Sequence, residues 1–389
     1  MSNMTVLRPS SASDLAMILR DSAASSYKIN VLGNDSKRLM AGPILLSDVN
    51  ISTAALNDVL DYERNDLTIS VGAGLSFAKL QELLRRNSQM IALDPPFIEE
   101  ATVGGVLAAN CSGPMRRGYG TARDLVIGMT FATLDGKLIK TGGMVVKNVA
   151  GLDMAKLLIG SFGTLAVITS VNFRVHSLPE ATETFIFSTP KLEAALEKRN
   201  EILRSPLRPM AIDLISKSVA ANVESGEWLL AIRAGGTRAV LHRYGRELQQ
   251  STVLKSAEEA AFWKQISEFT PAFLNHNLSG VVLRIGTSLD DVGVLLKTLS
   301  SPCISRSASG VTYVYLSSWQ TAATIWKAAK ERNWSAVVEF APDEIRSANE
   351  LWLPPRSLSE TNSFTMMERV KQMFDPSKLL NRSRLYGRI

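Results

Sequence analysis

The stretch from Ala101 to Asp124 (ATVGGVLAANCSGPMRRGYGTARD) combines very small residues with few side chains that could react themselves. Of the 25 glycines in the chain, 12 lie between Gly104 and Gly163. Glycine allows unusual backbone angles and lets a ligand approach the main chain closely. Main-chain N–H groups exposed in this way bind phosphate without a cation at each oxygen. The pattern predicts a site for a flat, negatively charged cofactor, although a set of tight turns without a ligand explains the glycine content equally well.

The order of the residues favours the cofactor. The run from Ala101 to Gly113 resembles the flavin loop of the FAD-binding family named after vanillyl-alcohol oxidase and p-cresol methylhydroxylase. The stretch KTGGMVVKNVAGLDMAKLLIGSFGTLAVIT (140–169) resembles one branch of it, the smaller FAD-binding subunit of bacterial glycolate oxidase complexes, and the resemblance continues to FDPSKLLNRSRLY near the C-terminus. It implies an α+β fold: a two-part FAD-binding domain of this type, followed by an α+β cap domain with an antiparallel sheet.

The resemblance implies flavin contacts in four parts of the chain. In the first loop they are Gly33, Asn34, Asp35, Ser36 and Lys37, where an Asn-Asp turn with no ligand is the alternative. In the glycine-rich stretch they are Thr102, Val103, Gly104, Gly105, Ala108, Ala109, Asn110, Ser112, Gly113, Tyr119, Gly120, Arg123 and Asp124. Before a later strand they are Gly163, Thr164 and Ile168, and in the tail Asn381 and Arg384, for which a solvated basic tail is the alternative.

Two further patterns limit the type of cofactor site. Relatives with covalently attached flavin often have a histidine in the first loop, and none occurs between Ile29 and Gly42, so FAD is expected to be non-covalent. The sequence Gly72-Ala73-Gly74 is not a dinucleotide fingerprint, because Phe77 occupies the third glycine position.

Oxidation of a 2-hydroxy acid requires an oriented C–H bond, a base for the hydroxyl proton and a cation for the carboxylate, with the flavin as redox group. His176, His242 and His276 lie in no diagnostic motif. Arg284, in VVLRIG, is the candidate catalytic residue because it could bind a carboxylate from the second domain. The alternative for such an arginine is an ion pair between domains. No metal site is predicted.

The composition is that of an ordinary globular protein. With 389 residues, 46% hydrophobic and 21% charged, two domains are expected. The net charge of +6 favours anionic ligands, an acidic partner or a membrane surface, but the scattered Lys and Arg do not indicate nucleic acid. The N-terminus lacks a signal-peptide pattern. We therefore expect a cytoplasmic protein; attachment to the inner face of the membrane through a complex is the alternative.

Two cysteines, Cys111 and Cys303, exclude an iron–sulfur cluster held by this chain alone, because such clusters require about four thiolates. The resemblance implies a larger FAD-binding sister subunit and an iron–sulfur subunit that pass electrons to quinone. Three functions stay open: an FAD-carrying subunit of a glycolate oxidase complex that acts on glycolate or D-lactate, a self-sufficient FAD-dependent 2-hydroxy acid dehydrogenase, and a scaffold subunit that has lost FAD.

Hydrophobic periodicity predicts the elements that position these residues. We expect an FAD-binding domain over residues 1–178, a cap domain over 179–363 and a returning helix and tail over 364–389. Strands are expected at PILLSD (43–48) and DLTISVGAG (66–74), with a two-residue hairpin turn at Asp135-Gly136. Helices are expected after Ser76, whose side chain could cap the first turn, and after Asp153. In the cap, strands alternate with helices near 191–203, 238–249, 257–269, 290–299 and 321–332, which suggests a sheet covered by helices on one side. A last helix is expected over 364–373.

Overall fold

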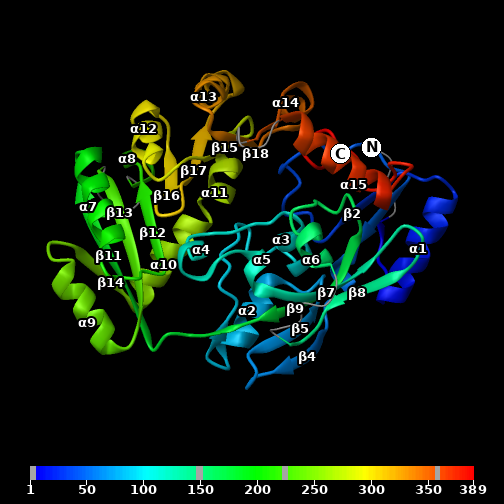
Figure 1. Cartoon of the computed structure of the whole chain (residues 1–389), viewed down its shortest axis with the longest axis horizontal. Coiled ribbons are helices and arrows are strands. Elements are labelled where there is room, and N and C mark those ends of the chain that lie inside the picture. Colours follow the sequence, from blue (N-terminus) through cyan, green and yellow to red (C-terminus); the bar gives the residue numbers. More distant parts are fainter. Residues whose placement is uncertain (1–5, 146–151, 221–226, 355–359) are drawn as a thin grey trace.

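The computed structural model describes residues 6–145, 152–220, 227–354 and 360–389, and it has the expected α+β organisation. An N-terminal part (residues 6–178) lies beside a larger sheet, and the C-terminal segment returns to lie near the N-terminus (Figure 1). Among the described residues, no helix combines the length and the apolar character needed to cross a bilayer.

The N-terminal part contains two sheets. A three-stranded parallel sheet has the order β1-β3-β2, and a five-stranded antiparallel sheet has the order β4-β5-β9-β7-β8. A two-stranded ladder, β6-β10, lies beside them. The strands are β1 (Val6–Leu7), β2 (Ile29–Leu32), β3 (Val49–Ser52), β4 (Val59–Glu63), β5 (Thr68–Gly72), β6 (Gln89–Met90), β7 (Val126–Ala132), β8 (Leu138–Gly142), β9 (Val167–Arg174) and β10 (His176–Ser177).

The helices of this part are short apart from α1 (Ala12–Ala24) and α2 (Phe77–Arg85). Helix α2 buries Phe77, Leu80 and Leu84 on one face, as its spacing predicts. The glycine-rich stretch, expected to be a loop, contains three short helices of four to six residues, and a 3-10 turn follows β3. These are α3 (Val103–Ala108), α4 (Arg116–Tyr119), α5 (Ala122–Leu125) and the turn Thr53–Ala55. Helix α6 (Met154–Leu158) begins after Asp153, as expected, and the Asp153 side chain accepts a hydrogen bond from the Lys156 N–H.

Three local predictions were wrong. Residues 43–48 form no strand: β3 begins at Val49, and the Asn30 side chain donates to the Leu45 carbonyl in place of a ladder. The turn at Asp135-Gly136 has three residues between the closing Thr133 and Lys137. Ser76 occupies the N-cap position of α2, but its side chain makes no capping bond.

The cap is a nine-stranded antiparallel sheet in the order β14-β11-β13-β12-β16-β17-β15-β18-β19. Its strands are β11 (Ala181–Thr189), β12 (Ala211–Ile215), β13 (Trp228–Gly236), β14 (Thr252–Lys255), β15 (Val281–Gly286), β16 (Cys303–Arg306), β17 (Val311–Leu316), β18 (Ser335–Phe340) and β19 (Trp352–Leu353). One face is covered by α7 (Leu192–Arg204), α9 (Arg238–Glu247), α12 (Asp291–Thr298) and α13 (Trp319–Arg332), as expected.

The opposite face of the cap sheet is covered as well, which the sequence did not predict. Helices α10 (Ser256–Ser267) and α11 (Phe269–His276) pack there in one hydrophobic cluster with residues of the N-terminal part. The short helices α8 (Lys217–Ala220) and α14 (Asp343–Ala348) complete the cap. This inner face of the sheet is therefore the one that meets the N-terminal part.

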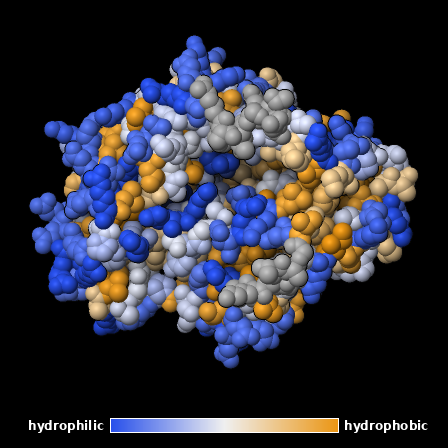
Figure 2. Space-filling view, in the orientation of Figure 1, coloured by the Kyte–Doolittle hydropathy of each residue, from blue (hydrophilic) through white to orange (hydrophobic). Residues whose placement is uncertain are grey.

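The C-terminal segment binds the chain together. Helix α15 (Glu360–Phe374) begins four residues earlier than expected, and the tail then pairs Leu380 with Ile29 of β2. The surface in Figure 2 is mostly hydrophilic over the cap, whereas hydrophobic residues gather on the right, over the N-terminal part. The division of the chain at residues 178 and 363 stays a prediction.

Candidate functional site

A groove of about 170 Å³ lies where the first loop, helix α3 and the start of β9 meet. Its walls come from segments far apart in the sequence, which the returning tail helps to hold together. The lining residues are Asn30, Val31, Leu32, Gly33, Asn34, Asp35, Ser36, Lys37, Arg38, Ile44, Asn50, Thr53, Thr102, Gly104, Gly105, Ala108, Ala109, Phe162, Gly163, Ala166, Val167, Ile168, Asn381 and Arg384.

The first loop presents free main-chain donors to this groove. Among the described residues, no hydrogen-bond acceptor is recorded for the backbone N–H of Asn34, Asp35, Ser36 or Lys37. Asp35 has φ of 58°, in the left-handed region that aspartate tolerates better than most residues, so the turn forms without a second glycine. A run of unpaired N–H groups beside Lys37 is a suitable environment for a phosphate.

The N–H groups at the start of α3, in contrast, are already bonded. At the start of α3, Val103 N–H donates to the Leu75 carbonyl at 2.9 Å and Gly104 N–H to the Ala73 carbonyl at 2.7 Å. Gly105 N–H donates to the Thr102 hydroxyl at 3.2 Å. The small residues here therefore provide close approach, while the free donors lie in the first loop.

Gly104 and Gly105 are small for different reasons. A Cβ at Gly104 would lie 2.9 Å from the Ala73 Cβ, so this glycine lets α3 pack against the end of β5. A Cβ at Gly105 would meet only the Thr102 hydroxyl, at 3.1 Å, and is otherwise open to the groove. Gly105 therefore keeps free a volume that a ligand could occupy.

A second cavity of about 240 Å³ continues the groove toward the cap and shares Ala109 and Phe162 with it. We call it the cap cavity. The N-terminal part contributes Met40, Ala41, Ala109, Asn110, Ser112, Arg116, Ile159, Gly160 and Phe162; the cap contributes Arg284, Tyr313, Val337 and Glu339, and the tail contributes Tyr386.

Strand alternation explains why polar side chains of the cap reach this cavity. In β15, Val281, Leu283 and Ile285 pack against the outer helices, so Arg284 faces the opposite way. Tyr313 of β17 pairs directly with Arg284 across the ladder and shares that face.

Arg284 forms an ion pair with Glu339 of β18, with 2.7 Å between Nε and Oε2. Both residues belong to the cap sheet, so the alternative of an ion pair between domains was wrong. The carboxylate raises the pKa of Arg284, and burial, followed by the charge of Glu339, raises the pKa of Tyr313 to about 12. At neutral pH Arg284 is a cation and Tyr313 a hydrogen-bond donor.

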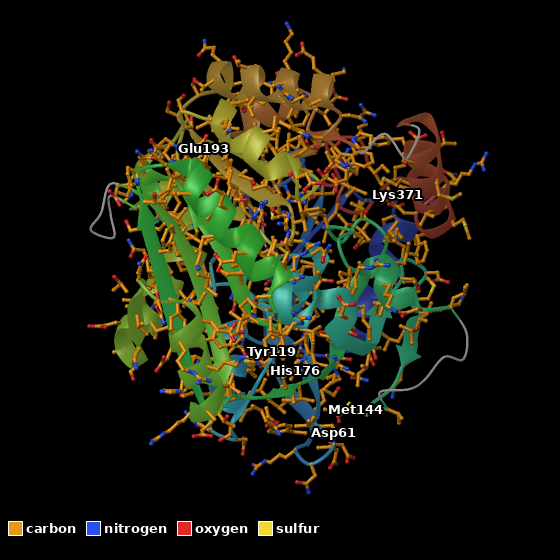
Figure 3. The ribbon with its side chains drawn as sticks, turned by 60° about the vertical axis from the view of Figure 1, so that its left-hand side comes forward. Asp61, Tyr119, Met144, His176, Glu193 and Lys371 are labelled. Atoms are coloured by element: carbon orange, nitrogen blue, oxygen red, sulfur yellow. The ribbon has the colours of Figure 1, made fainter. Side chains whose placement is uncertain are left out.

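None of the three histidines lines the groove or the cap cavity. His176 lies edge-on against Tyr119, with 5.0 Å between ring centroids, and Figure 3 labels the two residues next to each other. Burial, followed by the charge of Arg174, lowers the pKa of His176. His242 and His276 are exposed on cap helices α9 and α11.

Most residues implied by the resemblance gather at these two cavities, although no bound ligand tests their roles. Those of the first loop, together with Thr102, Gly104, Gly105, Ala108, Ala109, Gly163, Ile168, Asn381 and Arg384, line the groove. Asn110, Ser112 and Arg284 line the cap cavity. Seven others line neither: Val103, Gly113, Tyr119, Gly120, Arg123, Asp124 and Thr164. Their flavin contacts stay predictions.

These seven residues have structural partners instead. Val103 is in the hydrophobic core, and Gly113 packs against Asp94. Asp124 caps α5 through the N–H of Thr121, and the Arg123 side chain donates to the Lys156 carbonyl. Gly120 has φ of 85° beside Asp124, and Thr164 is fully buried, donating its hydroxyl proton to the Ser161 carbonyl.

Asn381 is buried and Arg384 is partly buried, so the alternative of a solvated basic tail was wrong for these two residues. The Asn381 side chain accepts from the Val31 N–H at 2.7 Å and donates to the Phe162 carbonyl at 2.8 Å. Arg384 donates to the carbonyls of Gly42 and Lys37, and burial lowers its pKa to about 10. Both residues therefore fix the walls of the groove.

Sequence reasoning missed several cavity residues. Arg116, Tyr313, Glu339 and Tyr386 were not proposed for the site, although all four line the cap cavity. Alternation in VTYVYL and SAVVEF could have placed Tyr313 and Glu339 on one face of their strands, as VVLRIG did for Arg284. Nothing local in the sequence brings Arg116 or Tyr386 to the same cavity.

Comparison with known proteins identifies the cofactor of the N-terminal part. Residues 4–142 match a protein-family model described as an FAD binding domain. These residues form an FAD-binding domain. The groove fits the cofactor because free N–H groups lie at one end, Gly105 leaves volume beside α3, and the groove continues into the cap cavity.

Similar proteins agree with this identification. The chain is 29% identical over 72% of its length to glycolate oxidase subunit GlcE of Escherichia coli, of which the match covers 80%. It is 30% identical over 58% of its length to a D-lactate dehydrogenase of Archaeoglobus fulgidus and 27% identical over 43% to glycolate oxidase subunit GlcD of Bacillus subtilis, but these matches span only 49% and 36% of those proteins.

Two solved structures share the fold over almost the whole chain. Alkyldihydroxyacetonephosphate synthase gives a TM-score of 0.71 over 97% of this chain and 75% of the other, at 17% identity. 4-Ethylphenol oxidase of Gulosibacter chungangensis gives 0.72 over 98% and 89%, at 14% identity. With its FAD-binding domain and its glycolate oxidase and D-lactate dehydrogenase relatives, the chain is an FAD-dependent oxidoreductase.

Proposed function

We propose that this FAD-dependent oxidoreductase oxidises a small 2-hydroxy acid, glycolate or D-lactate, to the 2-oxo acid as the FAD-binding subunit of a glycolate oxidase-type complex. The names of the relatives support the substrate class and the subunit assignment. The observation that carries the proposal is the cap cavity, which adjoins the groove and contains Arg284, Arg116 and Glu339. Because two of these side chains are cationic and one is anionic, the cavity favours a small anionic substrate.

In this proposal Arg284 binds the substrate carboxylate. Its Nε is bound to Glu339, and no partner for its two other guanidinium nitrogens is recorded among the described residues. Arginine presents such nitrogens as a planar pair that matches a carboxylate. Tyr313, which stays protonated, would donate a hydrogen bond to the substrate. When bound, the flavin supplies the two-electron acceptor.

The electrons would leave through partner subunits. Cys111 and Cys303 are both buried and unbridged, and no group of three or more potential metal ligands occurs in the described parts of the chain. We therefore propose an iron–sulfur subunit and a larger FAD-binding sister subunit as partners, in a cytoplasmic complex at the inner face of the membrane. Non-covalent attachment of FAD is part of the same proposal.

Two measurements test this function. The visible spectrum of the chain, purified alone and together with the products of neighbouring genes, reports whether it carries FAD. Anaerobic mixing with glycolate, D-lactate or L-lactate then reports whether that flavin is reduced. Reduction in the isolated chain supports the proposal, and steady turnover with a quinone in the absence of partners would favour a self-sufficient dehydrogenase instead. A colourless chain that still assembles would favour a scaffold subunit.

A further inference from the structure

We infer that Glu339 is the base that accepts the hydroxyl proton of the substrate, and that Arg284 holds it in position. This inference rests on the proposed function, because it concerns the same cavity and the same 2-hydroxy acid. It names a residue that neither the sequence motifs nor the similar proteins assign.

Glu339 lies on the same face of β18 as Val337, two residues earlier, at an irregularity of the sheet. Val282 pairs with Phe340 and Leu283 with Val338, so Glu339 is the extra residue of a β-bulge in β18. Bulges re-aim side chains and are frequent beside active sites. The main-chain carbonyl of Glu339 also accepts the Ala41 N–H at 3.1 Å, which ties the bulge to the FAD-binding domain.

The ion pair with Arg284 occupies one carboxylate oxygen of Glu339 and leaves the other for the substrate. Oε2 accepts the Arg284 Nε–H at 2.7 Å, whereas no partner for Oε1 is recorded within the described parts of the chain. In the proposed complex, Arg284 binds Glu339 through Nε and the substrate carboxylate through its two terminal nitrogens. The two anions then lie side by side. In a 2-hydroxy acid the hydroxyl is on the carbon next to the carboxylate, so it would then lie beside Glu339.

Other groups of the cavity do not fit the role of base. Tyr313 keeps its proton because its pKa is raised to about 12, burial also raises the pKa of Tyr386, and Arg284 and Arg116 are cations. The histidines lie elsewhere. Glu339 is the one carboxylate among the residues that line the cap cavity.

The step balances with FAD as the oxidant. The substrate O–H bond breaks and its proton passes to Glu339. The hydrogen of the adjacent C–H bond leaves with its electron pair to the oxidised flavin, and the carbon–oxygen bond becomes the carbonyl of the 2-oxo acid. A positioned general base typically contributes a factor of about 10² to 10⁴ to such a step.

The variant Glu339→Gln tests the inference, because glutamine keeps an oxygen that can accept from Arg284 but cannot take up a proton. We expect normal FAD content and a rate of flavin reduction by glycolate or D-lactate that is lower by about 10² to 10⁴. The matched control is Glu259→Gln. Glu259 forms another Arg–Glu pair on the inner face, with 2.8 Å between its Oε1 and the Arg233 Nε, but it does not line the cap cavity. This variant should leave the rate of flavin reduction unchanged.

Binding of oxalate provides a readout that does not depend on turnover. Its second carboxylate would occupy the position of the substrate hydroxyl and meet the charge of Glu339. Glu339→Gln should therefore bind oxalate at least about tenfold more tightly, as measured by perturbation of the flavin spectrum, whereas a structural role for Glu339 predicts weaker or equal binding.

The outcomes separate this inference from the proposed function. If wild-type flavin is reduced and Glu339→Gln reduces it equally fast, the inference fails and the function stands. If no 2-hydroxy acid reduces the wild-type flavin, alone or in the complex, both fail. Should the glutamine variant lose FAD, Glu339→Asp decides, since a retained but displaced carboxylate should give an intermediate rate, and a wild-type rate would overturn the inference.

Discussion

At the scale of single residues, the adjacent glycines Gly104 and Gly105 differ in role: the first allows close packing, and the second keeps volume free in the groove. Gly104 faces Ala73, whose Cβ and carbonyl oxygen would lie 2.9 and 3.1 Å from an added Cβ, so any side chain there would disturb the packing of α3. Gly105, one residue later, faces the groove. A pattern of small residues in the sequence cannot distinguish these roles, because both require the same absence of a side chain.

We expect Gly105→Val to abolish retention of FAD while leaving the protein folded. The valine Cβ would meet only the Thr102 hydroxyl, at 3.1 Å, and its methyl groups would project into the volume that the groove keeps free. The ratio of FAD to protein, taken from the visible spectrum after gel filtration, measures the effect, and circular dichroism checks the fold.

Gly245→Val is the matched control for this glycine. Gly245 lies on cap helix α9, where a Cβ would meet nothing within 4 Å. The control should retain FAD fully. Equal FAD content in both variants would mean that the ligand does not lie beside α3.

At the scale of elements, a buried lysine attaches the C-terminal helix to the N-terminal part. Lys371 of α15, labelled in Figure 3, donates to the carbonyls of Thr164 and Leu380 at 2.7 and 2.9 Å, and to Asp375 at 2.6 Å. Asp375 in turn accepts the N–H groups of Leu379 and Leu380. All three ammonium protons are therefore used, and they fix the start of the tail that lines the groove.

Lys371→Met should lower the free energy of unfolding by about 3–5 kcal/mol, because it leaves the buried Asp375 without its cation. It should also weaken FAD binding, since Asn381 and Arg384 lose their support. Chemical denaturation and hydrogen exchange of residues 376–389 measure the two effects.

The matched control is Lys330→Met, which replaces an exposed lysine of α13 by methionine. It should change stability by no more than about 0.5 kcal/mol. Slow hydrogen exchange in the tail of the Lys371 variant would show that the tail is held by other contacts.

The elements that the sequence predicted best are helices with long amphipathic patterns, such as α7 and α13. The short helices α3, α4 and α5 were missed because glycine disfavours helices, and here tertiary contacts and capping decide instead. The sequence analysis proposed Arg284 as a carboxylate ligand, but its partner Glu339 is 55 residues away, at a bulge of another strand. No local pattern encodes that meeting.

At the scale of the whole molecule, the cavity exists because the cap and the FAD-binding domain are held against each other at several points. Met40 pairs with Phe340, and the buried Arg346 donates to the carbonyls of Met40, Ala41 and Gly42. On the other side of the interface, Glu268 between α10 and α11 accepts the N–H groups of two residues of the FAD-binding domain.

Glu268→Gln should loosen this second attachment without removing FAD. The carboxylate accepts the Phe97 N–H at 3.1 Å and the Ile98 N–H at 3.0 Å, each with a different oxygen, and burial raises its pKa. Glutamine offers one oxygen and turns an NH₂ toward the other N–H, so stability should fall by about 1–3 kcal/mol. FAD content should stay normal, because none of these three residues lines the groove.

The loosened interface should be visible at the flavin itself. If the cap shields the flavin end of the site, iodide should quench flavin fluorescence more strongly in Glu268→Gln than in the wild type. Glu247→Gln, an exposed pair with Arg243, is the control and should change neither quenching nor, beyond about 0.5 kcal/mol, stability. Lower stability with unchanged quenching would mean that the Arg346 side of the interface alone keeps the cavity closed, and that Glu268 contributes to folding but not to shielding.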